Sequence, residues 1–151
     1  MPRRPISLHL LIALLIFLSL GALICGAMIM IAPDGSLIGL SMEIAQHMPF
    51  PDFFIPGLCL FLFLGVLPLI AAITLMPQHT PTWIEKLNIY RDYCAGWMLA
   101  LFSGFGTLIW ITVQHQMTQT FHVLQTIYAA VGLLILVMAL WPATMRCCRI
   151  A

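Results

Sequence analysis

Four long apolar stretches, separated by short polar segments, dominate the pattern of the chain. They cover about residues 6–31, 52–76, 93–113 and 121–141, and each is long enough for a helix to cross the hydrocarbon core of a bilayer. The apolar residues run continuously instead of alternating, which favours helices over barrel strands. The pattern predicts an all-α membrane protein in which residues 1–151 form a single transmembrane domain, a bundle of four helices.

The segment between the first two stretches predicts a shorter helix of a different kind. From Leu37 to Met48, apolar residues recur at helical spacing with polar residues between them. This segment is too short to span a bilayer, so we expect an amphipathic helix that lies in the extracytoplasmic interface. Asp52 follows it and is placed to cap the second span.

Turn and capping residues set the other expected boundaries. Pro68 predicts a kink in the second span. Thr82 and Glu85 have the spacing of a capping box, which predicts a polar helix that runs directly into the third span. Pro142 is expected to end the fourth span.

Composition supports a membrane setting. Apolar residues make up 62% of the chain and charged residues only 7%, whereas a soluble domain carries about a quarter charged residues. The lipid bilayer is therefore the expected surrounding. The formal net charge is +1 and no basic patch is present, which argues against nucleic acid as a partner.

The basic residues predict the orientation. They occur only in the N-terminus, the second loop and the C-terminal tail, and the first and third loops have none. By the positive-inside rule, both termini are expected in the cytoplasm. Aromatic residues are expected to mark the inner interface, among them Trp97. The basic residues are Arg3, Arg4, Lys86, Arg91, Arg146 and Arg149.

Small residues at helical spacing predict where helices pack closely. Gly96, Ala100 and Gly104 recur every four residues on the third span, and Ala22 and Gly26 form a shorter stripe on the first. Such stripes let helix backbones approach each other in lipid. The stripe on the third span could serve the bundle itself, or it could receive a second copy or a partner protein.

Most of the polar groups with candidate chemistry lie on the outer side. Two or three of them could bind a divalent metal or supply an acid and a base, although no established metal motif is present. The alternative interpretation is a polar helix face at the headgroup level, with Asp52 as a cap. The candidates are Glu43, His47, Asp52, His115 and His122.

No cofactor is expected. His9 and His122 fall at opposite membrane surfaces, so this pair cannot bind one haem between them. Cys147 and Cys148 lie beside arginines in the tail and are either accessible thiols without a function or a site of lipid attachment.

The spans themselves carry no charged residue at their centres, which disfavours proton-coupled transport by a single bundle. We therefore expect a non-enzymatic accessory or interaction subunit. The alternatives are an oligomeric channel or small-molecule transporter, and a membrane-embedded enzyme or metal protein with an extracytoplasmic site.

The segment PDGSLIGLSMEIAQHMPFPDFFIPG, followed by LCLFLFLGVLPL, resembles a type of small bacterial four-helix inner-membrane protein whose members are mostly uncharacterised. The resemblance is clearest over about residues 33–69, and Trp110 and Gln114 extend it. It implies the same topology and a bacterial inner-membrane location. It implies no catalytic residues, because no activity is attached to the pattern.

Overall fold

The computed structural model describes residues 4–45, 49–76, 82–118 and 123–150. Within these ranges the chain is helical, with one isolated bridge between Tyr93 and Arg149, so the all-α prediction is confirmed. The long helices are α1 (Ile6–Ile31), α6 (Ala95–Thr118), α7 (Val123–Ala139) and a helix composed of α3 (Phe54–Cys59), the π-helical η2 (Leu60–Val66) and α4 (Leu67–Leu75).

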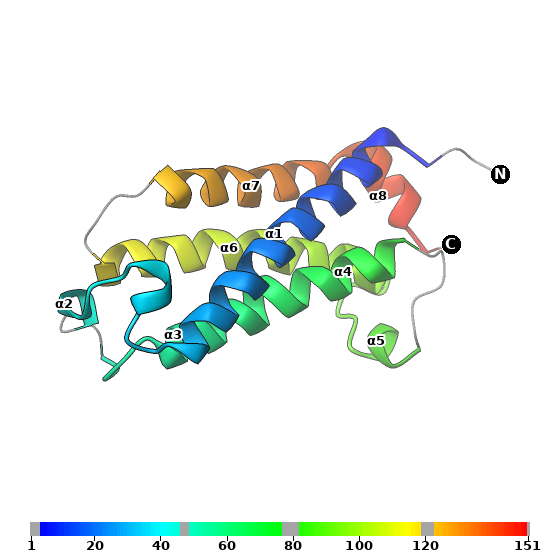
Figure 1. The fold of residues 1–151 in the computed structure, drawn as a ribbon. Coiled ribbons are helices and arrows are strands. Elements are labelled where there is room, and N and C mark those ends of the chain that lie inside the picture. The colour runs from blue at the N-terminus through cyan, green and yellow to red at the C-terminus, as the bar shows by residue number, and fades with distance from the viewer. Residues whose placement is uncertain (1–3, 46–48, 77–81, 119–122, 151) are drawn as a thin grey trace.

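Three of these helices, Ile6–Ile31, Phe54–Leu75 and Ala95–Thr118, are long and apolar enough to cross a membrane. A fourth span results if α7 and α8 (Pro142–Cys148), which meet at a bend of 64°, are counted as one. The helices form an elongated bundle in which α1 packs against α3, η2, α4 and α7, while α6 packs against α4 and α7 (Figure 1). The first and last described residues lie at one end with α5 (Thr82–Lys86) and α8, and α2 (Met42–Ala45) lies at the other.

The second span is widened in its middle. The seven residues of η2 have π-helical turns, and Pro68, which cannot donate a backbone hydrogen bond, follows directly in α4. Ser19 of α1 donates its hydroxyl to the Gly65 carbonyl at 2.8 Å inside this stretch. A hydroxyl from a neighbouring helix can satisfy a carbonyl where helical turns are irregular, so the distortion near Pro68 is accommodated by α1.

The segment after α1 differs from its prediction. In place of one amphipathic helix over 37–48, the described part contains a 3-10 turn, η1 (Ser36–Ile38), and the short α2. Gly39 separates them with a φ of 70°, a left-handed conformation that ends a helical turn. The prediction of a continuous helix is wrong because Gly39 redirects the backbone, and the prediction considered only the spacing of apolar residues. Residues 46–48 lie outside the described residues.

The polar segment before the third span also differs. Its helix, α5, ends at Lys86, and the next helix, α6, begins only at Ala95. The predicted continuous polar helix into the third span is therefore absent from the described residues 82–118. The Glu85 carboxylate accepts two hydrogen bonds from residues that follow it in the chain. One oxygen accepts a bond from the Asn88 side-chain amide at 2.8 Å, and the other accepts a bond from the Ala95 backbone N–H at 3.2 Å. Glu85 therefore caps the start of α6, where a carboxylate is favoured by the helix dipole.

The chain turns sharply after α7. Trp141 is extended, as expected for a residue that precedes proline, and Pro142 is the first residue of α8. The proline ends the fourth long helix but also starts a new one, which the sequence pattern did not predict. Thr144 in α8 is buried and donates to the Ser7 hydroxyl of α1 at 2.7 Å, which attaches the tail to the bundle.

Candidate functional site

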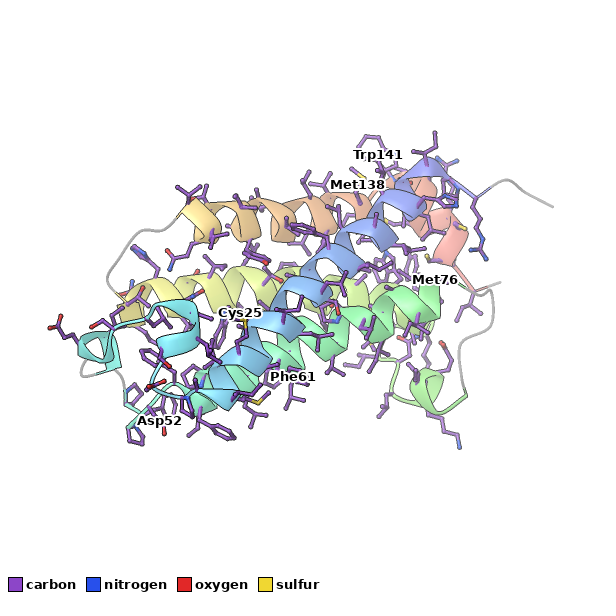
Figure 2. The ribbon with its side chains drawn as sticks, viewed as in Figure 1. Cys25, Asp52, Phe61, Met76, Met138 and Trp141 are labelled. Carbon is purple, nitrogen blue, oxygen red and sulfur yellow. The ribbon has the colours of Figure 1, made fainter. Side chains whose placement is uncertain are left out.

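The outer polar candidates are at the end of the bundle that holds α2. Glu43 is exposed on α2, His115 is exposed in the last turns of α6, and these two helices contact each other. Asp52 lies near the start of α3 (Figure 2) and accepts the Phe54 N–H at 3.0 Å. The N-cap of α3 is Phe53, so Asp52 binds the first N–H of the helix from one position before the cap that the sequence predicted it to be.

Two of the five candidates, His47 and His122, lie outside the described residues. Among the described residues there is no group of three histidine, cysteine or acidic side chains that could hold a metal ion. The nearby Asp34 forms a local turn: its carboxylate accepts the Ser36 hydroxyl at 2.8 Å and the Ser36 N–H at 3.1 Å, and these bonds lower the pKa of Asp34. A metal or acid–base site at this end stays a prediction.

The small residues of α1 form a close crossing with the second span. A Cβ atom at Gly26 would lie 2.9 Å from both the nitrogen and the Cβ of Phe61, and 3.0 Å from the Gly57 carbonyl oxygen. A Cβ at Gly57 would in turn meet Ile29. Ala22, one turn before Gly26, is also buried. The two glycines thus bring the α1 and α3 backbones together, and Gly57 is a partner that the sequence did not indicate.

The stripe on α6 is covered by the chain's own helices. Gly96, Ala100 and Gly104 are all buried. A Cβ at Gly96 would lie 2.8 Å from the Thr74 hydroxyl oxygen of α4, and one at Gly104 would lie 2.7 Å from Leu136 and 3.2 Å from the Gly132 oxygen of α7. The stripe therefore packs on two different neighbours within one chain.

The opposite face of α6 is open. Phe102, Phe105 and Ile109 are exposed, and they follow one another at helical spacing. Gly106 lies beside them, and a Cβ added there would meet nothing within 4 Å. This face (Phe102, Phe105, Gly106 and Ile109) is apolar and is not covered by the described part of the chain.

The buried polar side chains are bonded within the chain. Thr74, Ser103 and Thr107 donate to carbonyls of their own helices at 2.7–3.0 Å, whereas Ser19 and Thr144 bond to other elements. No buried side-chain nitrogen or oxygen in the described ranges lacks a hydrogen-bond partner. Each of these groups satisfies its hydrogen-bonding requirement within the chain, as buried polar groups must.

The opposite end of the bundle contains an aromatic cluster. Trp97 is only 4% exposed, donates its indole N–H to the Ala139 carbonyl at 2.8 Å, and stacks on Tyr93 with ring centroids 4.3 Å apart. Tyr90 meets the same indole edge to face. Trp97 therefore lies at this end of the bundle with its ring buried and its N–H satisfying the C-terminus of α7, and its expected place at the inner interface stays a prediction.

Two cysteines meet at this same end. Cys94 immediately precedes α6, and Cys148 is the last residue of α8; the Cys94 N–H donates to the Cys148 carbonyl at 2.8 Å and the two thiols are hydrogen-bonded to each other. Sequence reasoning considered Cys147 and Cys148 but not Cys94. Cys94 falls inside the third predicted span, residues 93–113, and no local signal there pairs it with residue 148.

Comparison of the chain with protein-family models, with curated proteins and with solved structures gives no match. The resemblance of residues 33–69 to small bacterial four-helix proteins stays a prediction.

Proposed function

We propose that this chain is a four-span protein of the bacterial inner membrane, with both termini in the cytoplasm, that serves as a non-enzymatic accessory subunit of a membrane complex. The proposal rests on one observation: the buried glycines and polar groups of the described residues serve contacts within the chain, while Gly106 lies uncovered on an exposed apolar face of α6. Glycine pairs bring the helices together, and the buried polar side chains bond to the chain itself. Polar groups that served a transported solute would instead face a cavity.

The charges support the orientation. Of the six basic residues, the five in the described ranges lie in the N-terminal segment, in the 82–94 region or in the C-terminal segment, which gather at one end of the bundle (Figure 1). That end would face the cytoplasm under the positive-inside rule. A fluorescent-protein fusion at the C-terminus is expected to be bright and a periplasmic phosphatase fused there inactive. The reverse pair of results would contradict this orientation.

The open face of α6 is the surface to which a partner helix would bind. Gly106 leaves room for a close backbone approach, and Phe105 and Ile109 beside it supply apolar contact area. The buried stripe of Gly96 and Gly104 would then hold the bundle together, and the open face would bind the partner. The partner would present an apolar transmembrane helix of its own.

The test is purification of the tagged full chain from native membranes at native expression level in a mild detergent. A partner at constant stoichiometry is expected with the wild-type chain, and Gly106→Leu is expected to lose it, because the larger side chain fills the approach. The matched control is Leu134→Ala on α7, whose side chain is 46% exposed, and this variant should retain the partner.

An isolated chain that carries a bound small molecule, or that moves a solute in reconstituted vesicles, would overturn the proposal. A partner that survives Gly106→Leu would show that the α6 face is not the binding surface.

A further inference from the structure

Two thiols from distant parts of the sequence meet at the end of the bundle that holds α5 and α8. The chain before α6 and the chain after α8 run antiparallel, with Tyr93 opposite Arg149. Two backbone hydrogen bonds fix them: Cys94 N–H to the Cys148 carbonyl at 2.8 Å and Ile150 N–H to the Asp92 carbonyl at 2.9 Å. This pairing places the two cysteine side chains in hydrogen-bonding contact.

The two thiols have different surroundings. The Cys94 sulfur accepts hydrogen bonds from the Cys148 thiol and from the Trp97 backbone N–H in the first turn of α6, and these bonds lower the pKa of Cys94 to about 7. Burial and the nearby Glu85 carboxylate oppose the effect. Cys94 is partly exposed, whereas Cys148 is only 5% exposed. A partly accessible thiolate beside a second thiol is the arrangement of a cysteine that oxidises reversibly.

We propose that Cys94 and Cys148 form an oxidation site that hydrogen peroxide converts into an intramolecular disulfide, with Cys94 as the attacking thiol and Cys148 as the resolving thiol. The Cys94 thiolate attacks one peroxide oxygen, the O–O bond breaks, and the departing hydroxide takes a proton to become water. Cys94 is then a sulfenic acid. The Cys148 sulfur attacks the Cys94 sulfur and loses its proton, the S–O bond breaks, and a second water leaves.

Overall, two thiols are oxidised by two electrons and one peroxide is reduced to two waters. A dithiol reductant reverses the reaction by thiol–disulfide exchange. The disulfide would join the C-terminus of α8 covalently to the start of α6, where the reduced chain has the backbone pairing of residues 92–94 with 148–150. Oxidation would thereby fix the position of the tail at the face that carries the basic residues.

Cys147 provides an internal control. It is adjacent to Cys148 in sequence but is exposed, and the backbone pairing sets Cys148 and not Cys147 opposite Cys94. A tail whose cysteines oxidise merely because they are accessible would react first at Cys147.

The experiment uses the reduced full chain in detergent micelles, treated with hydrogen peroxide, alkylated, digested without reductant and mapped by mass spectrometry. Wild type and Cys147→Ser are expected to lose two free thiols each, to give the same peptide linkage between Cys94 and Cys148, and to recover both thiols with dithiothreitol. In Cys148→Ser, a dimedone-type reagent is expected to trap a sulfenic acid on Cys94.

The linkage found in the wild-type chain tests the proposal without depending on whether any variant folds. A disulfide between Cys147 and Cys148, a dimer joined through Cys147, or a Cys94 thiol that survives peroxide while Cys147 is oxidised would each overturn the proposal. Circular dichroism of Cys148→Ser would show that its helices are retained, so that absence of the trapped sulfenic acid would also count against it.

Discussion

The substitution Gly26→Ala tests the close backbone approach between α1 and the second span. The added methyl group would lie 2.9 Å from the Phe61 nitrogen and 3.0 Å from the Gly57 carbonyl oxygen. Both are backbone atoms, so no side-chain rotation relieves the overlap, and α1 must move away from the second span by a few tenths of an ångström, roughly, to restore ordinary contact.

The expected loss follows from two opposing effects. Overpacking of a tight contact costs about 1–3 kcal/mol, whereas replacing glycine by alanine within a helix gains about 0.5–1 kcal/mol. We expect Gly26→Ala to lower the free energy of unfolding by about 1 kcal/mol, the difference between the midpoints of these two ranges. The assay is titration of the protein in mixed micelles with sodium dodecyl sulfate, followed by circular dichroism.

Gly106→Ala is the matched control. Gly106 is also in the middle of a long helix, but nothing lies within 4 Å of an added Cβ. This variant should match or exceed the stability of the wild type by up to about 1 kcal/mol. Equal stability of Gly26→Ala and wild type, or an equal loss in Gly106→Ala, would refute the argument that close backbone approach at Gly26 holds α1 in place.

Three further substitutions test separate features in the same unfolding assay. Trp97→Phe replaces the buried indole by a smaller phenyl ring and removes the N–H that binds the Ala139 carbonyl, and should cost at least about 1 kcal/mol; an unchanged midpoint would mean that this bond adds nothing. Ser19→Ala removes the hydroxyl from the Gly65 carbonyl and should cost about 0.6 kcal/mol, the average for hydrogen bonds between membrane helices; a gain in stability would contradict it. Gly39→Ala should cost about 1 kcal/mol although its Cβ would meet nothing, because φ is 70°; Gly39→Asn, which tolerates this conformation better, should cost less, and equal losses would point to another cause.

Several features of the fold could be predicted because they depend on local sequence. The limits of α1, Ile6–Ile31, follow from an uninterrupted apolar run after Pro5. Asp52 was predicted as the N-cap of the second span; it binds the Phe54 N–H, but from one residue before the N-cap, Phe53. The interfacial helix could not be predicted correctly, because apolar spacing alone does not show that Gly39 adopts a positive φ.

The candidate sites depended on contacts between distant segments and were predicted less well. Small-residue spacing identified Gly26 and Gly104, but not the glycines that face them across each helix crossing, Gly57 and Gly132. Cys94 was missed altogether. Nothing in the local sequence around residue 94 indicates that the chain returns to it at residue 148.

The sequence by itself determined that this is a helical chain with four long apolar stretches, because helix length and hydrophobicity are properties of each segment alone. Only the tertiary structure decided how those helices are rotated against one another. That rotation directs Gly104 toward α7, leaves Gly106 open, buries Trp97 beneath the end of α7 and brings Cys148 to Cys94. Rotation follows from the simultaneous packing of all the helices, and a one-dimensional pattern that repeats along a single helix does not contain it.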